Sequence, residues 1–475
     1  MQVVKIRGKT KLKKVISAAI IAGILGLQTM PALAADNITT AAPKQFKSMV
    51  KKNKKTSDDY KYAYVNIDFW DKFNDDILSG YIQKAIINNY DLKMATLNVE
   101  EYYQQTRLQF AHELPTATVG ASPALTKMPG ATNTDMFFAV PAIVNYEADI
   151  FLKNRDKTKS VKKLYENAQF DERAAYISIA SAVGSTYLNL VALDKTIELQ
   201  EEIVKSRKQI YDLMVLSNKE GLVSTADTVK ANKAYVKGQT DLIELNKQRE
   251  TALTQLCVLL GESPENAKSL ERSNFDDLNY NNEIPDYIAS EIIIQRPDYL
   301  KAENSVEKAG IDVRVAKKEF LPSINITGLA LFNAGDIGSI FTTKNALFAL
   351  AGGALLPIFT GGQKIANLRL KKATYERILQ NYYKTNLTAI QEVNDALVKV
   401  KLDKQKVDQT LKQANLERAD YKFNEHKFNQ GTISKLDLIQ YKENLLTIDQ
   451  LVAQNKVEFM VDYIGLYKAT GSKLN

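Results

Sequence analysis

The sequence has 475 residues, of which 45% are hydrophobic and 25% charged, and its 63 basic and 55 acidic residues give a formal charge of +8. Six of the basic residues lie within the first 14 positions, in a segment that we expect to be removed, so 57 basic residues remain against 55 acidic ones. A near-neutral mature chain argues against nucleic-acid binding, which needs a strong basic field. The single cysteine, Cys257, excludes an intramolecular disulfide.

The N-terminus has the three parts of an export signal. A basic head is followed by an apolar core over residues 15–30 and by the small-residue sequence Ala32-Leu33-Ala34. We therefore predict a signal peptide over residues 1–34. The apolar core is shorter than the ~20 residues of a membrane span, and we expect no membrane helix later in the chain. Because no cysteine stands at the cleavage point, we also expect no lipid anchor.

Residues 35–69 are predicted to form an extended arm. Six of its lysines lie from Lys44 to Lys55, with no acidic residue among them. Blocks of like charge are usually disordered. A solvated, flexible arm is one interpretation, and contact with anionic lipid or cell-wall polymer is the other.

Two proline-free zones, 142–263 and 358–475, predict unusually long helices. Apolar residues recur in the first zone mostly at three- and four-residue steps, which is helical periodicity. As single helices, residues 158–218 would extend ~90 Å and residues 363–429 ~100 Å at about 1.5 Å per residue. Helices of this length predict coiled-coil packing.

Each long helix is predicted to end in a hairpin tip, at KEGLVSTAD (219–227) and at NQGTISKLD (429–437). Both stretches hold a glycine that fits the left-handed position closing a helix, a serine that fits the next N-cap, and an aspartate at the capping-box spacing. These residues are Gly221, Ser224 and Asp227 in the first tip, and Gly431, Ser434 and Asp437 in the second.

The two tips belong to a duplication that covers most of the chain. Matching segments lie 207 to 210 residues apart, such as Glu113-Leu114-Pro115 with Phe320-Leu321-Pro322, and Gly261 with Gly471. We therefore predict two tandem units, over residues 70–288 and 289–475.

Each unit also carries a segment of strand character, at about 115–146 and 322–357. Stretches of ~10 alternating or small residues there are typical of a transmembrane β-barrel, and a soluble β-hairpin is the alternative. Two hairpins give four strands, which cannot close a barrel, and lipid does not tolerate open sheet edges. If these strands cross a membrane, several chains must share one barrel.

The sequence resembles the TolC family of outer membrane efflux proteins, close to its OprM-like branch. The matching residues lie between 70 and 471: Trp70 with Phe73, Tyr146-Glu147-Ala148-Asp149-Ile150-Phe151, Arg296-Pro297-Asp298, Ala316-Lys317-Lys318-Glu319-Phe320-Leu321-Pro322-Ser323, Leu356-Pro357-Ile358-Phe359-Thr360-Gly361-Gly362, and Glu392-Val393-Asn394-Asp395-Ala396-Leu397. The resemblance implies a mainly α-helical protein with transmembrane β-strands. In it, a homotrimer forms a twelve-stranded β-barrel, four strands per chain, in the outer membrane of a Gram-negative bacterium. A long α-helical barrel continues the channel into the periplasm.

The resemblance also implies a function and partners. The protein would be the passive exit duct of a tripartite efflux system, receiving substrates from an inner-membrane transporter of RND or ABC type through a periplasmic adaptor. One alternative is the outer membrane component of a type I protein secretion system. A second is a soluble periplasmic adaptor or coiled-coil scaffold, which the two strand pairs disfavour.

In this family the periplasmic gate lies at the hairpin tips. Asp437 matches a ring-forming aspartate, whereas Gln440 stands where a second aspartate is common, so we expect a weaker or shifted charge ring. Asp437 also fits a helix cap, and Asp227 is expected to be structural or to pair across the gate. The remaining tip residues are expected either to pack within the trimer or to contact the adaptor. They are Gly221, Leu222, Val223, Gly431, Thr432 and Ile433.

No motif for catalysis is evident. Neither His112 nor His426 has a second histidine at ligand spacing, and no phosphate-binding loop or nucleophile elbow is present. We expect no enzymatic activity, no metal and no cofactor.

Overall fold

The computed structural model describes residues 59–126, 135–278 and 283–474. By its internal contacts the chain divides into two compact regions, Met1–Tyr60 and Lys61–Asn475, and the second region holds nearly all the described residues. The predicted signal peptide and the lysines at 44–55 lie outside the described residues. The α-helices are α3 (Asp59–Val65), α4 (Ile67–Asp71), α5 (Asp76–Asn88), α6 (Tyr90–Ala111), α7 (Lys153–Lys219), α8 (Thr225–Leu259), α9 (Ser290–Ile293), α10 (Pro297–Lys318), α11 (Gln363–Asn429) and α12 (Lys435–Ala469). The strands are β1 (Thr116–Val119), β2 (Ser122–Thr126), β3 (Asp135–Ala148), β4 (Ser323–Ala334) and β5 (Ala346–Leu355). Short 3₁₀ turns are η2 (Pro264–Ser269), η3 (Phe275–Asp277), η4 (Ile337–Ser339) and η5 (Thr343–Asn345).

The extended arm was predicted to reach residue 69, and this boundary is wrong. Residues 59–65 form α3 and residues 67–69 begin α4, and Val65 and Phe69 are almost completely buried. From Tyr60 onward the segment is rich in aromatic residues. Their apolar surface gives this stretch enough packing energy to fold, which the lysine run before it lacks.

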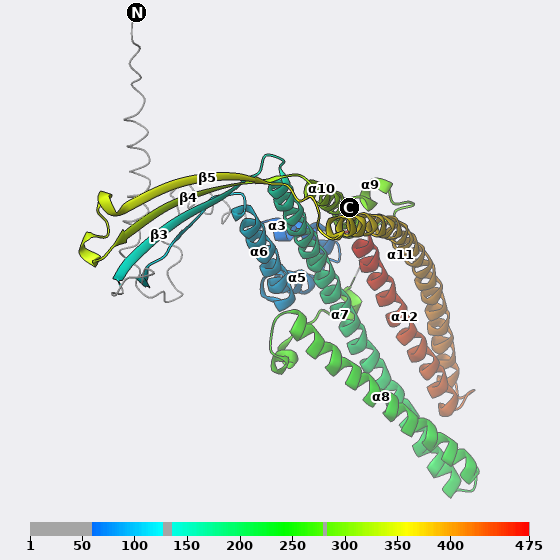
Figure 1. Ribbon diagram of the computed structural model, residues 1–475. Coiled ribbons are helices and arrows are strands. Elements are labelled where there is room, and N and C mark those ends of the chain that lie inside the picture. The colour runs from blue at the N-terminus through cyan, green and yellow to red at the C-terminus, as the bar shows by residue number, and fades with distance from the viewer. Residues whose placement is uncertain (1–58, 127–134, 279–282, 475) are drawn as a thin grey trace, which may run out of the picture. The chain divides into compact units, whose positions relative to one another are not determined.

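The long helices are confirmed, and they repeat with equal lengths. Helices α7 and α11 each have 67 residues, and each is followed by a 35-residue helix, α8 or α12. The helices that precede the strands, α6 and α10, each have 22 residues. Two copies of one helix–strand–strand–helix–helix unit therefore build the chain (Figure 1).

One segment of α7 has the length and hydropathy of a membrane span, although the sequence suggested no such segment. An 18-residue window there has a mean hydropathy of 1.4, and 67% of it is buried inside the protein. Helix α7 includes the fully buried Val183, Tyr187, Leu188 and Leu190. The apolar character of this stretch is explained by core packing.

The strands form one sheet in the order β1-β3-β4-β5, with β2 also pairing β3. β1 and β2 continue a single register along β3, from Thr116 opposite Asn145 to Thr126 opposite Asp135. The regular strand pairing with β3 is interrupted between β1 and β2 at Gly120, which lies opposite Pro141. Because proline has no N–H, it cannot complete the ladder at that point. β1 and β2 are thus two parts of the first predicted strand, which is interrupted where Pro141 of β3 lies opposite.

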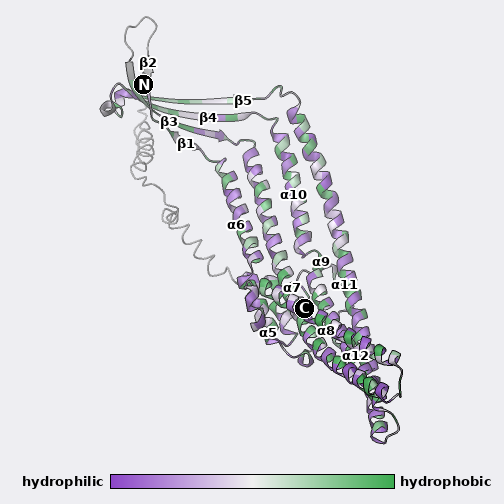
Figure 2. Cartoon of the chain, turned by 90° about the horizontal axis from the view of Figure 1, so that it is seen from below, coloured by the Kyte–Doolittle hydropathy of each residue, from purple (hydrophilic) through white to green (hydrophobic). Residues whose placement is uncertain are grey.

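The pairing of β3 with β4 joins the strands of the two tandem units into one four-stranded layer. It runs antiparallel from Phe138 opposite Ala334 to Ala148 opposite Ile324, whereas the sequence predicted only two hairpins. Figure 2 shows α6, α7, α10 and α11 leaving one end of this sheet side by side. β5 is exposed over nearly its whole length.

The main core lies away from the sheet, where the N-terminal helices pack against α7 and α12. Trp70 is fully buried, with its ring 5.3 Å from that of Tyr467 and 5.2 Å from that of Phe69. The Nδ2 of Asn66 donates to the carbonyls of Ser472 (3.0 Å) and Leu474 (3.2 Å). Residues from the first and last parts of the described chain therefore close the same core.

Candidate functional site: the hairpin tips

Both helical hairpins point away from the sheet, and their tips lie toward the same end of the unit (Figure 1). The first tip joins α7 to α8 and the second joins α11 to α12. This arrangement follows from the duplication, because each unit places its two longest helices after its strands.

Both predicted glycine closures are confirmed. Gly221 has φ +74° and Gly431 has φ +73°, in the left-handed region. Beyond each glycine, the next N–H reaches back across the helix end, from Leu222 to the carbonyl of Ser217 and from Thr432 to that of Lys427, both at 2.9 Å. This Schellman pattern satisfies carbonyls that the helix end would leave unpaired.

Both predicted capping boxes are confirmed as well. The N–H of Asp437 donates to Ser434 Oγ at 3.1 Å, and the N–H of Ser434 donates to Asp437 Oδ2 at 3.1 Å. Ser224 and Asp227 form the same reciprocal pair in the first tip. Hydrogen bonds from the serine lower the pKa of each aspartate below its ordinary value. Both carboxylates therefore stay charged at neutral pH, and the lining of a pore by Asp437 stays a prediction.

The tips differ in what they expose. Leu222 is 77% exposed, whereas Val223 and Ile433 are half-buried. Thr432 is exposed and donates its hydroxyl to the carbonyl of Lys427 at 2.9 Å. Gln440 is also exposed, one turn beyond Asp437. Leu222 is thus the most exposed apolar side chain of the two tips.

An ion pair that the sequence did not suggest fastens the second hairpin to the first. Arg207 of α7 donates through Nε to Glu443 Oε1 of α12 at 2.8 Å, and its Nη2 lies 2.6 Å from the same oxygen. Arg207 also donates to the carbonyl of Ala234 in α8 at 3.3 Å. Glu202 and Lys442 form a second link between α7 and α12 at 2.7 Å. We call these two ion pairs the inter-hairpin clamp.

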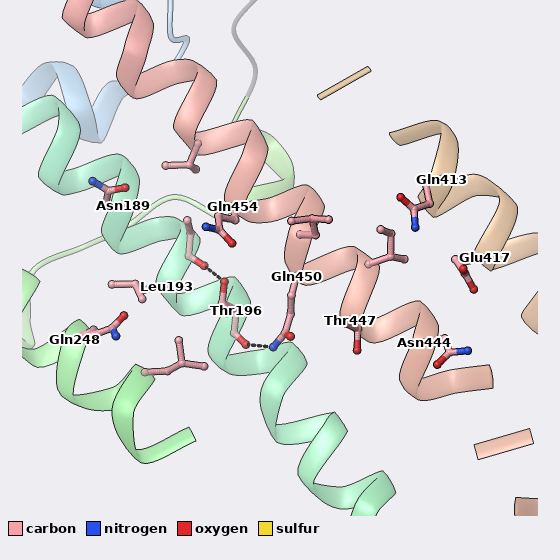
Figure 3. A pocket seen from close by; sticks show the side chains of 15 residues that line it. Asn189, Leu193, Thr196, Gln248, Gln413, Glu417, Asn444, Thr447, Gln450 and Gln454 are labelled. Carbon is pink, nitrogen blue, oxygen red and sulfur yellow. Dashed lines mark hydrogen bonds between the residues drawn. The ribbon is translucent and has the colours of Figure 1, made fainter. Parts of the chain in front are cut away.

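Little apolar packing supports the clamp. The buried apolar cluster beside it consists of Leu199, Ile203 and Leu446. Closer to the sheet than this cluster, a groove of about 850 Å³ lies between the two hairpins (Figure 3). Gln450 crosses toward α7 and donates to the carbonyl of Thr196 at 3.3 Å. Most polar side chains around the groove are neutral amides, including Asn189, Gln248, Gln413, Asn444 and Gln454. Polar contacts therefore make up much of what joins the hairpins here.

Replacing Gly431 with alanine is expected to strain the second tip. A side chain at positive φ costs about 1 kcal/mol or more, and we expect reduced efflux with normal amounts of assembled protein. Gly221→Ala should behave alike. The matched control is Gly80→Ala, because Gly80 lies in α5 with open space around it and no positive φ. Export at the wild-type rate by both tip variants, measured as dye efflux, would refute the functional role of the tips.

The comparisons with known proteins agree with this geometry. The family model described as outer membrane efflux protein matches residues 81–262 and 288–472. The probable efflux pump outer membrane protein TtgC of Pseudomonas putida is 27% identical over 408 residues, covering 84% of each chain. The cation efflux system protein CusC of Escherichia coli is 25% identical over 409 residues, covering 86% of this chain and 89% of CusC.

Among solved structures, the outer membrane channel CmeC of Campylobacter jejuni superimposes with a TM-score of 0.78. It is 25% identical, and the match covers 86% of this chain and 89% of CmeC. The alternative of a soluble adaptor or scaffold is not supported, since the match runs along both units of an outer membrane channel. The chain belongs to the outer membrane efflux protein family and is an outer membrane efflux channel.

Proposed function

We propose that three copies of this chain form the channel and share one twelve-stranded β-barrel. The observation that carries this proposal is the four-stranded sheet with two open edges. Within the described residues, the outer edges of β1 and β5 have no strand beside them. A lipid-exposed edge leaves backbone groups without hydrogen bonds, which membranes do not tolerate.

The strand directions favour closure by further copies. All pairings along β1-β3-β4-β5 are antiparallel, so β1 and β5 run in opposite directions. β5 of one copy can therefore pair antiparallel with β1 and β2 of the next. With 14 residues in β3 and 12 in β4, these strands exceed the ~9–11 residues that a tilted membrane strand needs.

The remaining parts fit a passive duct. The long helices of each copy would continue the barrel into the periplasm, with the tips as its gate. Asp437, one copy from each chain, would line the constriction, with Gln440 one turn away and Asp227 capping the first tip. Gly221, Leu222 and Val223 of the first tip and Gly431, Thr432 and Ile433 of the second would contact a periplasmic adaptor, which links the channel to an inner-membrane transporter of RND or ABC type.

The inter-hairpin clamp would stabilise the closed state of this gate. Arg207 and Glu443 hold α12 against α7, so an open state requires that these polar contacts separate. An adaptor would favour the open state by contacting the separated hairpins preferentially. No chemical step is needed for such transport, and we propose no enzymatic role for His112, at the end of α6, or for His426, in the last turn of α11.

Single-channel recording in planar bilayers tests the duct and the gate together. We expect a cation-preferring pore that divalent cations block, and we expect Asp437→Asn to reduce both properties, because it removes charge from a ring near the axis. Asparagine retains an oxygen that can accept the capping hydrogen bond. Asp227→Asn is the matched control, since Asp227 makes the same capping box.

Three outcomes separate the parts of the proposal. Pore formation with altered selectivity only in Asp437→Asn supports the duct and its gate. Equal selectivity in all three proteins retains the duct and refutes the aspartate ring. Protein that never inserts, or that cross-links as a monomer in membranes, refutes the shared barrel.

A further inference from the structure

The junction between the sheet and the helices carries a band of exposed apolar side chains. Ile358 and Phe359, between β5 and α11, are 92% and 89% exposed, and Ile150, between β3 and α7, is 64% exposed. Leu114 and Phe320 precede β1 and β4, and both are exposed. The register brings all four junctions to one end of the sheet, since Thr116 lies opposite Asn145 and Ser323 opposite Leu355.

Directly beyond this apolar band, both long helices begin with a run of basic residues. Residues 153–163 contain six basic residues and one acidic residue, Asp156, while residues 363–372 contain four basic residues and no acidic one. The mature chain as a whole is near neutral, so this clustering is local. It does not stabilise the helices, because cations at a helix N-terminus oppose the helix dipole.

Two of the acidic side chains at this junction are neutralised by ion pairs, whereas Asp149 and Glu319 accept hydrogen bonds only from the N–H of Arg155 and from Asn367 Nδ2. Asp156 is bound by Arg314 (3.0 Å) and Lys318 (2.7 Å), and Glu147 by Lys153 (2.6 Å). By contrast, Arg155, Arg369 and Lys372 are exposed, and none of them has a carboxylate within ion-pair distance among the described residues. Unneutralised positive charge therefore remains below the apolar band in both units.

Distances along the helices match the thickness of a lipid headgroup layer. At about 1.5 Å per residue, Arg155 lies ~3 Å, Arg369 ~9 Å and Lys372 ~14 Å beyond the start of its helix. The headgroup region adds roughly 5–8 Å to each side of the hydrocarbon core, and charge attraction extends about a further 8–10 Å at physiological salt.

We propose that this surface, with Ile150, Ile358 and Phe359 in the acyl region and Arg155, Arg369 and Lys372 beneath them, binds anionic phospholipid headgroups of the periplasmic leaflet. The proposal rests on the barrel spanning the outer membrane. Continuity with the sheet places the apolar band at the membrane boundary, and the basic residues beyond it complement negative headgroups. The surface therefore fixes the depth of the channel in the membrane.

Electron paramagnetic resonance of spin-labelled lipids tests this inference on the full-length protein. The protein is reconstituted in phosphatidylcholine vesicles, and the association of spin-labelled phosphatidylglycerol is compared with that of spin-labelled phosphatidylcholine. We expect wild type to prefer phosphatidylglycerol about fivefold at low salt, with the preference declining as salt rises. The triple variant Arg155→Gln/Arg369→Gln/Lys372→Gln should lower the preference toward one.

The matched control removes the same number of exposed charges from α8, as Lys230→Gln/Lys233→Gln/Lys237→Gln, and should keep the preference. No preference in wild type, an unchanged preference in the first variant, or an equal loss in both variants would overturn the inference. So would loss of cross-linked trimers in the first variant alone, because the surface would then lie between copies. Failure of wild type to insert would instead refute the shared barrel, which separates the two proposals.

Discussion

Gly184→Ala is expected to lower the stability of the assembled protein more than the same change at any other glycine inside a described α-helix. A Cβ at Gly184 would lie 2.3 Å from Cζ3 and 2.8 Å from Cη2 of Trp70. Trp70 cannot yield easily, because it is fully buried among Phe69, Phe73 and Tyr467. Overpacking of this kind costs about 1–3 kcal/mol and occasionally more. The measurement is the apparent melting temperature of the purified protein in detergent.

The indole provides an internal check on this prediction. Trp70→Phe removes the part of the ring that a Cβ at position 184 would meet. We expect Trp70→Phe/Gly184→Ala to be more stable than the sum of the two single effects, since the smaller ring makes room for the methyl group. Gly80→Ala serves as the control. Strictly additive effects would show that the two residues do not compete for the same space.

Breaking the inter-hairpin clamp is expected to open the channel. Arg207→Met leaves Glu443 largely buried without its cation, and a charged hydrogen bond of this kind contributes about 1.5–3 kcal/mol. A shift of that size raises the ratio of open to closed channels roughly tenfold to a hundredfold. The measurement is open probability in planar bilayers, without adaptor.

Two further variants make this prediction specific. Lys208→Met is the matched control, because Lys208 pairs at 2.8 Å with Asp212 within α7 and joins no second hairpin. The charge exchange Arg207→Glu/Glu443→Arg should restore part of the closed state. Open probability that is the same in Arg207→Met and in wild type would show that the ion pair of Arg207 with Glu443 does not hold the gate.

The features that the sequence predicted correctly are those with local causes. Each tip consists of a glycine at positive φ, a serine three residues later and an aspartate three residues after the serine. This local pattern is nearly sufficient to specify a tip, so both tips lie where we expected them. Long helices followed from the absence of proline and from apolar periodicity. The repeat was visible because both units retain the same segment lengths.

The features that it missed depend on contacts between distant residues. Arg207 and Glu443 are 236 positions apart, which is not the repeat spacing, and neither belongs to a motif. The pairing of β3 with β4 crosses the boundary between the units. The packing of residues 59–69 is not evident from the sequence, because their aromatic partners lie in α7 and α12, far along the chain. A single sequence carries no signal for such pairs.

The closure of the core by distant residues has a consequence for the order of synthesis. Tyr467 donates its hydroxyl to the carbonyl of Val65, 402 positions earlier, and Asn66 binds the backbone of Ser472 and Leu474. In a chain that emerges into the periplasm from its N-terminus, Phe69 and Trp70 lack their contact with Tyr467 until the last residues arrive. Long-range closure of this kind is slow. Folding of the core is thus completed only at the end of translocation, and a stop codon just before Tyr467 would produce an unfolded chain instead of a shorter channel.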